Sequence, residues 1–491
     1  MIQFSAAPSL KPSQTPKTFV ALAYDQEEGL LNFQGKAGES IRKALREEGF
    51  QGKEGQPAVT HSKGPLGAEK GIVLGLGEKG KLAPETLRRA GGRLARKARE
   101  IRVEEAFVEW PRSLKGDLLK AFAEGLILGS YQFIRYKTQL KDAPKGIQKF
   151  TFIVPSDSLT DAKSTLKTAE SYAQGTLLAR DLINGAPSDV TPRVLAQTAK
   201  KLAKGPVKIK LYSTKELKRM GAGGILGVNI GSALEPYLIH MHYKPKGTSK
   251  RSVAIVGKGI TFDSGGLSLK PAGSMETMKM DMSGAAAVLG VFSQLTKLQP
   301  KVEVHGIIAT TENMPGGRAY KPGDVLKALN GKTMEVLNTD AEGRLILSDA
   351  LSYAVRQKPD AIIDMATLTG ACVVALGSLV SGAMGNDASL LDKVKAATEA
   401  EGEPVWELPL VKEYRDDIKS KVADIKNIGS AREAGSIIGG LFLQEFVGDT
   451  PWVHLDIAGP AYLEREYPAV PYLTYGGTGL MVRSLLTFLA G

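Results

Sequence analysis

The stretch SVAIVGKGITFDSGGLSLKP, residues 252 to 271, decides the fold class, because an apolar strand leads directly into a glycine-rich loop. An uninterrupted apolar run of this kind is typical of a strand buried on both faces of a parallel sheet. Strand and loop together deliver Lys258, Asp263 and Lys270. A buried ammonium is costly, so Lys258 must reach solvent, be paired or be neutral, and a neutral amine can bind a metal.

Similar apolar runs alternate with helical patterns along the rest of the chain. Those in the C-terminal part are VKIKLY (207–212), PYLIHMHY (236–243), VEVHGIIA (302–309), AIIDMA (361–366) and WVHLDIAG (452–459). This alternation predicts an α/β fold with a central, mostly parallel sheet covered on both faces, and ligands bind at the carboxyl ends of such strands. The runs FVALAY (19–24), GIVLGLG (71–77) and FTFIVP (150–155) predict a small α/β domain before it.

The length of 491 residues favours two domains. A helical pattern from about Asp161 to Asn184 is stopped by the Gly and Pro residues of GAPSDVTP. We therefore predict an N-terminal α/β domain over residues 1–158, a linker helix over 159–184 and a larger catalytic α/β domain over 185–491.

The composition is that of a globular protein, with 43% hydrophobic and 24% charged residues. A single cysteine, Cys372, cannot form an intrachain disulfide and suits a reducing compartment. The N-terminal stretch lacks a basic segment followed by an apolar one, and no apolar run is long enough to span a membrane. We expect a cytoplasmic enzyme that does not contact membranes.

The formal net charge of +12 favours contact with an acidic partner, or simply solubility. The densest basic tract, RRAGGRLARKAREIR (88–102), predicts an amphipathic helix with a basic outer face. A solvated surface and a nucleic-acid patch are the two interpretations. No aromatic residues interleave to favour nucleic acid.

The stretch NTDAEGRL (338–345) places Asp340, Glu342 and Arg344 at alternate positions. It lies between a predicted buried strand, MEVLN, and a predicted helix, LILSDALSYAV. In an extended segment residues two apart point to the same side, so all three could face one cavity. Two crowded carboxylates resist joint ionisation unless a cation compensates them. The alternative is an exposed ion pair of Arg344 with one carboxylate.

MKMDMSGAAAVLG (278–290) adds Asp281, which by itself could simply cap the helix that follows. Together with Asp263, Asp340 and Glu342 it would bring four negative charges to neighbouring strand ends, and two divalent ions would balance them. Such ligands suit zinc, manganese or magnesium. His240 and His242 share a strand face but have no third ligand nearby in the sequence, so we interpret them as packing residues.

Six segments in this order resemble the leucyl aminopeptidase family, the two-metal cytosolic aminopeptidases of the aminopeptidase A type. They are VGKGITFDSGG, LSLKP, MKMDMSGAAAV, TENMPGG, KPGDVL and NTDAEGRL. Further similarity lies in ATLTGACVVALG, WELPL, VADIKNIG, FLQEFV and HLDIAGPAYL, so that the resemblance extends from about residue 178 to the C-terminus.

The resemblance implies a metalloprotease site with two metal ions. One ion would be held by Lys258, Asp263, Asp281 and Glu342, and a second, more exchangeable ion by Asp263, Asp340 and Glu342. Asp263 and Glu342 would bridge the two ions, which would be manganese, zinc or magnesium.

The resemblance also implies the reaction, a hydrolase activity that releases N-terminal residues from peptides. A water between the ions would become a hydroxide-like nucleophile. Lys270 would stabilise the oxyanion, and Arg344 would hold a bicarbonate that shuttles the proton. The pocket positions Met278, Thr367 and Gly370 imply a preference for Leu- or Met-like residues, and the family implies a homohexamer.

Two other functions stay open at this point. A DNA-binding accessory or regulatory role could replace or accompany the peptidase, using the basic tract at residues 88–102. A phosphoesterase could use the same metals, since Lys270 and Arg344 would both suit a phosphate.

Overall fold

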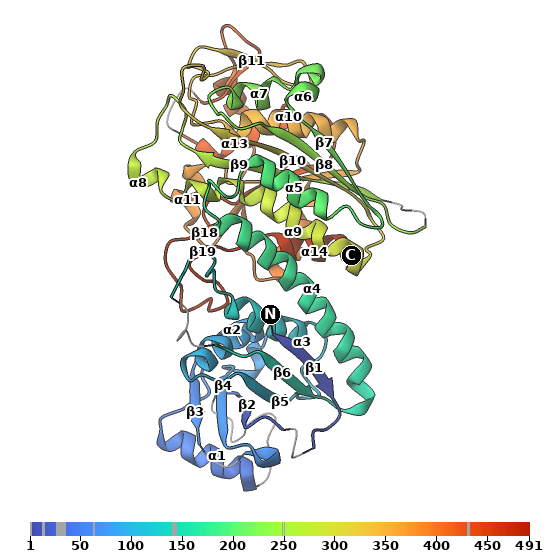
Figure 1. Cartoon of the computed structure of the whole chain (residues 1–491), viewed down its shortest axis with the longest axis vertical. Helices are drawn as coiled ribbons and strands as arrows, with labels where there is room; N and C mark the ends of the chain where they lie inside the picture. The colour runs from blue at the N-terminus through green and yellow to red at the C-terminus, as the bar shows by residue number, and fades with distance from the viewer. Residues whose placement is uncertain are drawn as a thin grey trace. The chain divides into compact units, whose positions relative to one another are not determined.

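The computed structural model describes residues 2–11, 15–25, 36–61, 64–139, 145–247, 249, 251–429 and 433–491. The N-terminal stretch considered for a targeting signal therefore lies partly outside these residues. The chain divides into two compact units (Figure 1). Unit 1 contains Met1–Ala173 with Arg465–Thr474, and unit 2 contains Gln174–Glu464 with Tyr475–Gly491.

Unit 1 is built on a six-stranded sheet in the order β1-β6-β5-β2-β4-β3. All neighbouring pairs are parallel except β3 with β4. The strands are β1 (Gln3–Ala7), β2 (Thr18–Ala23), β3 (Pro57–Thr60), β4 (Lys70–Gly75), β5 (Glu105–Glu109) and β6 (Lys149–Ile153). These include the three strands that the sequence predicts for the N-terminal part.

Side chains of this sheet alternate between two cores, as the two-residue period of a strand requires. Val20 and Val108 pack with α2 (Pro84–Glu100) and α3 (Asp117–Ser130) on one face. Phe19 and Phe107 pack with α1 (Lys36–Glu47) on the other face.

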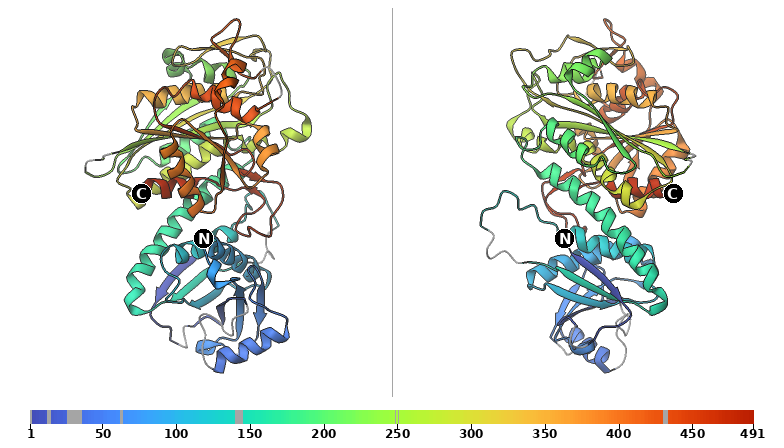
Figure 2. Two further views of the ribbon diagram at one scale, coloured as in Figure 1. Left: turned by 180° about the vertical axis from the view of Figure 1, so that it is seen from behind. Right: turned by 45° about the vertical axis from the view of Figure 1, so that its right-hand side comes forward.

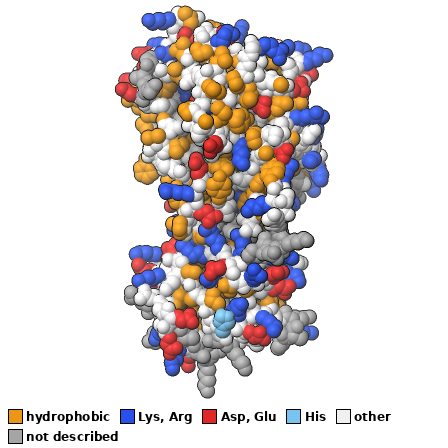
Figure 3. All heavy atoms as spheres, turned by 60° about the vertical axis from the view of Figure 1, so that its left-hand side comes forward, with side chains coloured by type: hydrophobic (Ala, Val, Ile, Leu, Met, Phe, Trp, Pro, Cys, Tyr) orange, Lys and Arg blue, Asp and Glu red, His pale blue; other side chains and the backbone are white. Residues whose placement is uncertain are grey.

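The basic tract lies in helix α2, as predicted, but several of its arginines are paired with acidic groups or carbonyls and are not simply solvated. Arg88 is 1% exposed and lies 2.8 Å from Glu85 and 3.3 Å from Glu124 of α3. Arg96 pairs with Glu466 and donates to the carbonyls of residues 471 and 473. Both arginines are therefore engaged within unit 1. On the face shown in Figure 3, basic and acidic side chains are interspersed.

Unit 2 contains an eight-stranded sheet in the order β15-β14-β17-β13-β9-β10-β8-β7. The central run β17-β13-β9-β10 is parallel, as is β15 with β14, whereas β14 with β17, β10 with β8 and β8 with β7 are antiparallel. The predicted mostly parallel sheet is confirmed. Its strands are β7 (Val207–Tyr212), β8 (Tyr237–Tyr243), β9 (Ser252–Asp263), β10 (Glu303–Asn313), β13 (Ala361–Ala366), β14 (Ser381–Gly385), β15 (Val405–Glu407) and β17 (Trp452–Asp456).

Helices cover both faces of this sheet, as Figures 1 and 2 show from several sides. One layer contains α5 (Pro192–Lys201), α9 (Ser283–Leu298) and α14 (Val482–Ala490), and the other contains α6 (Thr214–Met220), α7 (Gly223–Asn229) and α10 (Gly343–Arg356). The apolar face of α10 joins Ala254, Val256 and Ile307 in one core. In the described part of the chain, no helix is both long and apolar enough to cross a membrane.

The remaining elements are shorter or lie between these layers. A single helix, α4, spans Leu159–Asn184, where the sequence predicts one. The others are α8 (Ala272–Met275), α11 (Gly370–Leu376), α12 (Ala388–Ala400), α13 (Gly435–Gln444), β11 (Val325–Lys327), β12 (Thr333–Glu335), β16 (Ile425–Lys426), β18 (Tyr462–Leu463) and β19 (Gly476–Gly477).

Candidate metal centre

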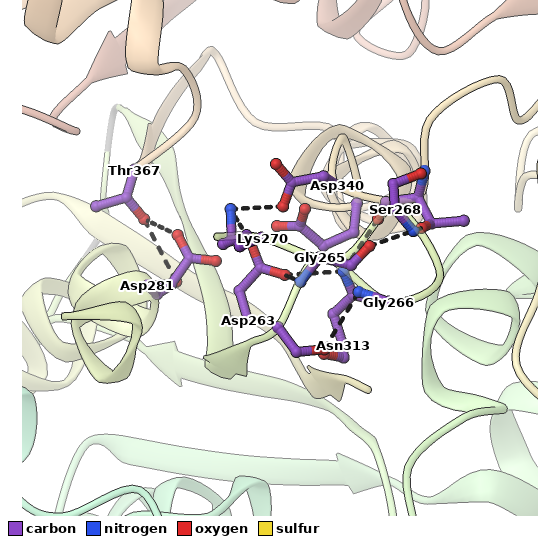
Figure 4. Close-up of polar contacts among 12 residues, drawn as sticks. Asp263, Gly265, Gly266, Ser268, Lys270, Asp281, Asn313, Asp340 and Thr367 are labelled. Atoms are coloured by element: carbon purple, nitrogen blue, oxygen red, sulfur yellow. Dashed lines mark hydrogen bonds and ion pairs between the residues drawn. The ribbon is translucent and has the colours of Figure 1, made fainter. Parts of the chain in front are cut away.

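Four acidic and two basic side chains converge beside β9. The strand supplies Lys258 and, at its last residue, Asp263. A short 3-10 helix, Met278–Met282, supplies Asp281 just before α9. The turn before α10 supplies Asp340 and Glu342. Figure 4 shows several of these residues pointing toward one another.

Lys258 organises the deeper side of this group. Its Nζ lies 2.7 Å from Asp281 Oδ1 and 2.9 Å from Glu342 Oε1, and it donates to the carbonyl of Thr367 at 2.8 Å. The lysine, Asp281 and Glu342 are at most 3% exposed. Gly343 leaves room for the lysine, because a Cβ there would lie 2.7 Å from Nζ.

Lys270 lies on the more open side. Its Nζ is 2.9 Å from Asp263 Oδ2 and 2.5 Å from Asp340 Oδ1 (Figure 4). The side chain of Asp340 is 31% exposed and that of Lys270 is 15% exposed, whereas that of Asp263 is 3% exposed. An ion or a substrate arriving from solvent would therefore meet Asp340 and Lys270 first.

The segment with Asp340, Glu342 and Arg344 is not extended, so the prediction that alternate spacing would direct all three side chains into one cavity is wrong. The preceding strand, β12, ends at Glu335, and Glu342 already has helical torsion angles (φ −81°, ψ −33°) before α10. The segment is a turn that enters a helix, so the two carboxylates converge without an extended backbone. The predicted helix after them is confirmed.

Arg344 forms no ion pair with the carboxylates of its own motif in the described part of the chain. It is 7% exposed, and its Nη1 donates to the carbonyl of Asn427 at 2.8 Å, so an exposed ion pair is wrong. Its Nε has no hydrogen-bond partner among the residues that the structure describes. Burial lowers the pKa of Arg344 to about 10, which leaves it cationic at neutral pH.

Asp263 is held by Asn313 and by the backbone of Gly265, for which the sequence predicted no role. Asn313 donates from Nδ2 to Asp263 Oδ1 at 2.8 Å, and the amide of Gly265 donates to the same oxygen at 2.8 Å (Figure 4). Gly265 has φ +86°, and a Cβ there would lie 2.4 Å from the carbonyl of Ser268, so the loop requires glycine. Asn313 lies in TENMPGG, one of the six segments that resemble the family, and this position was the only indication in the sequence that Asn313 has a role at the site.

The three predicted pocket residues lie in different surroundings. Thr367, 5% exposed, follows β13 and donates from Oγ1 to Asp281 Oδ1 at 2.6 Å (Figure 4). It contacts the acidic group directly. Met278 is half-buried at the start of the 3-10 helix, and Gly370 is exposed at the start of α11.

The acidic group cannot be fully ionised at low cost with two lysines alone. Burial, reinforced by Glu342, raises the pKa of Asp263 to about 7, and burial raises that of Asp281 well above its usual value. Burial alone would lower the pKa of Lys258, but Asp281, Glu342 and Asp263 outweigh it and raise it. The pKa of Glu342 is lowered because Lys258 and Lys270 outweigh the effect of its burial.

The donor atoms present fit divalent ions. Oxygens of Asp263, Asp340 and Glu342 lie within 4.8 Å of one another. Asp281 Oδ2 is buried and has no hydrogen-bond partner in the described part of the chain. Carboxylates with one amine are ligands for manganese, zinc or magnesium, and two dications would supply the missing positive charge.

The structure brings further possible ligands to His242, which the sequence order did not indicate, whereas His240 is not part of this group. Because β8 and β10 are antiparallel neighbours, His305 stands opposite His242, and Glu303 lies beside them. Burial lowers the pKa of His240 to about 3 and that of His305 to about 4.

The chain resembles known proteins along most of its length. A family model described as the cytosol aminopeptidase family, catalytic domain, matches residues 177–486, and one for its N-terminal domain matches residues 21–140. The chain is 46% identical over 444 residues to a probable cytosol aminopeptidase of Geobacter sp. (strain M21), covering 90% of the chain and 89% of that relative. It is 44% identical over 447 residues to one from Aquifex aeolicus (strain VF5), covering 90% and 88%.

A solved structure supports the same relationship. The bottromycin maturation enzyme BotP in complex with Mn is 33% identical, with a TM-score of 0.85 over 97% of this chain and 99% of that one. The resemblance inferred from the sequence motifs is thus confirmed. The chain belongs to the cytosol aminopeptidase family and is a metallo-exopeptidase hydrolase.

Proposed function

We propose that the protein is a two-metal aminopeptidase that releases single residues from the N-termini of peptides. The observation that carries this proposal is the convergence of four acids and two lysines on one largely buried point, where Asp281 Oδ2 lacks a partner among the described residues. A purely structural cluster would pair this oxygen, because a buried unpaired carboxylate oxygen is costly.

The site contains two overlapping sets of metal ligands, one deeply buried and one nearer to solvent. Lys258, Asp263, Asp281 and Glu342 would hold the deeper ion, and Asp263, Asp340 and Glu342 the outer one. The 31% exposure of the Asp340 side chain supports easier exchange on the outer side. Bound there, two divalent ions supply an activated water nucleophile and polarise the scissile carbonyl. Manganese and zinc suit these ligands best, and the solved relative contains Mn.

The two lysines have different tasks. Lys258 must lose a proton to become a ligand, and nearby dications would favour that loss. Lys270 stays an ammonium on the open side, from which it can donate to the oxyanion of the tetrahedral intermediate. One such donor typically contributes about 3 to 4 kcal/mol.

Arg344 would position an anion for proton transfer. Its cationic guanidinium has an Nε without a hydrogen-bond partner in the described ranges of the chain, and a planar guanidinium matches the two oxygens of bicarbonate. Bicarbonate would accept the proton of the attacking water, a role for which no free carboxylate is evident among the acids described at the centre.

The remaining parts of the proposal concern substrate and assembly. We propose a preference for Leu- or Met-like N-terminal residues, with Met278, Thr367 and Gly370 near the first side chain. We further propose a cytoplasmic location, supported by the names of the relatives as cytosol aminopeptidases, and a homohexamer, which rests on the family resemblance alone. The arginines of α2 are engaged within unit 1, so we favour peptides over nucleic acid as partners.

Leucine-p-nitroanilide and its N-acetylated form, assayed before and after chelation, test the proposal. We expect hydrolysis of the free amine only, loss of activity after chelation and recovery with Mn²⁺ or Zn²⁺. Equal hydrolysis of the acetylated compound would contradict exopeptidase action. Activity that survives verified metal removal would contradict the metal mechanism, and hydrolysis of a phosphoester instead would favour the phosphoesterase.

A further inference from the structure

The start of β10 and the adjoining part of β8 carry three of the five histidines of the chain. His240 and His242 occupy one face of β8, and Glu303 and His305 occupy the matching face of β10. The rings of His242 and His305 are stacked with centroids 4.5 Å apart and planes only 4° from parallel.

The three groups nearest solvent present ligand atoms to one another. His242 Nε2 lies 2.5 Å from Glu303 Oε1, and His305 Nε2 lies 3.9 Å from the same oxygen. His242, Glu303 and His305 each offer one atom within 4.8 Å of the others. The side chains of His242 and Glu303 are 29% and 26% exposed, which provides a route for an ion from solvent.

We propose that His242, His305 and Glu303 form a separate binding site for a zinc-like divalent cation, with the remaining coordination positions left to water. Two imidazoles and one carboxylate are a common ligand set for zinc, and they leave one position of a tetrahedron open. Rotation of the two stacked rings about their side-chain torsions would direct both Nε2 atoms toward one ion near Glu303.

Buried groups behind the site can support the tautomer that zinc requires. His305 Nδ1 lies 3.0 Å from His240 Nε2, His240 Nδ1 lies 3.0 Å from the hydroxyl of Tyr353, and that hydroxyl lies 2.7 Å from Tyr212. When His305 Nδ1 donates along this chain, its Nε2 presents a lone pair toward Glu303. Metal-ligating histidines usually have such a partner on the other ring nitrogen.

The site is distinct from the carboxylate centre. His305 and Asn313, the residue that supports Asp263, are eight residues apart on β10, and at about 3.3 Å per residue this separates them by about 26 Å. Lys208 of β7 stands opposite His242 but is exposed, so its ammonium can turn to water. The site therefore does not depend on the peptidase assignment.

Zinc binding to the full-length protein tests this site by stoichiometry. We would dialyse wild type, His242→Gln and Glu303→Gln against a buffered concentration of free Zn²⁺ and measure bound zinc by elemental analysis. Both replaced side chains are partly exposed, so the variants should fold. His61→Gln, which removes an exposed histidine of unit 1, is the matched control.

We expect each site variant to lose one zinc equivalent, or to bind it at least about tenfold more weakly, while His61→Gln retains the wild-type value. Tyr353→Phe, which breaks the buried chain, should weaken the same equivalent and leave the others unchanged. Identical zinc content in wild type, His242→Gln and Glu303→Gln would show that His242 and Glu303 form only an ion pair and would overturn the proposal. Aminopeptidase activity equal to wild type would verify folding of the variants.

Discussion

The two ends of β10 carry two clusters of potential metal ligands with opposite chemistry. At its last residue, Asn313 supports a centre of four acids and two lysines that is deep and densely charged. Near its first residue, His305 and Glu303 meet His242 in a shallower cluster of imidazoles with one acid. As proposed, one strand would offer oxygen-rich ligands for dications at one end and nitrogen ligands for a zinc-like ion at the other. The comparison indicates that the arrangement of the strands determines which side chains come together, whereas the types of those side chains determine which ion they suit.

Replacing Lys258 with arginine should have the largest effect on metal binding and activity. The effect should be confined to the carboxylate centre and should not extend to the histidine cluster. A guanidinium stays protonated and cannot act as a ligand. Lys258 also packs closely against Gly343, so the larger arginine side chain would be crowded there. We expect loss of tight metal binding at the carboxylate centre and a fall in activity of more than about 10³-fold, with zinc retained at the histidines. Metal analysis and peptidase assays measure both effects.

Lys297→Arg, an exposed change on α9, is the matched control and should behave like wild type. A Lys258→Arg protein with full metal content and full activity would refute the ligand assignment.

Replacing Lys270 with methionine should cost less and should separate binding from chemistry. The ammonium lies beside Asp263 and Asp340 on the open side, and as an oxyanion donor it acts on the transition state. We expect kcat to fall about 10²- to 10³-fold with little change in KM or in bound metal. A change confined to KM would instead make Lys270 a binding residue.

Thr367→Val should have a smaller effect on metal affinity at the carboxylate centre. It removes the hydroxyl that donates to Asp281 at 2.6 Å while keeping the volume and burial of the side chain. A hydrogen bond to a charged group contributes about 1.5 to 3 kcal/mol, so we expect metal affinity to weaken about 10- to 100-fold. Thr367→Ser retains the hydroxyl and should restore affinity, and equal affinities for valine and serine would assign Thr367 to packing alone.

The smallest predicted effect concerns stability and comes from His454, which lies outside the histidine cluster of β8 and β10. Unlike that cluster, His454 is paired with an acid in the core. His454 is fully buried, with Nδ1 2.7 Å from Asp364 Oδ1. Burial alone would lower its pKa, but Asp364 outweighs this and raises it above 6.5. The pair therefore stabilises the fold fully below about pH 6.5, and this contribution is lost as the pH rises through the raised pKa.

Urea unfolding of wild type and Asp364→Asn from pH 6 to pH 9 measures this contribution. We expect the pH-dependent loss of stability in wild type to be reduced in the variant, whose His454 lacks a charged partner. Equal slopes for the two proteins would contradict the charged pair.

The carboxylate centre could be predicted from the sequence because its residues lie in short motifs at the ends of apolar runs. Of the four acids, however, only Asp263 ends a strand of the large sheet, whereas Asp281 lies in a 3-10 helix and the other two lie in the turn before α10. Their convergence was therefore predictable from the series of motifs and not from strand ends alone. The strands of unit 2 were predictable because buried strands read as continuous apolar runs.

Other features depend on partners far away in the chain and could not be predicted. Arg344 turns toward Asn427, 83 residues later, and His305 stands 65 residues from the histidine that it meets, His240. Arg88 is buried because Glu124 of a neighbouring helix neutralises it. Composition and periodicity carry no information about these pairings, which the register of strands and the packing of helices decide.

The central claim is that the four acids assemble around two dications. Anomalous diffraction from crystals grown with Mn²⁺ tests it most directly. The account predicts two manganese peaks about 3.5 to 4 Å apart, both bounded by Asp263 and Glu342, with Lys258 and Asp281 on one of them and Asp340 on the other. Crystals of active enzyme with no peak among these carboxylates would contradict it.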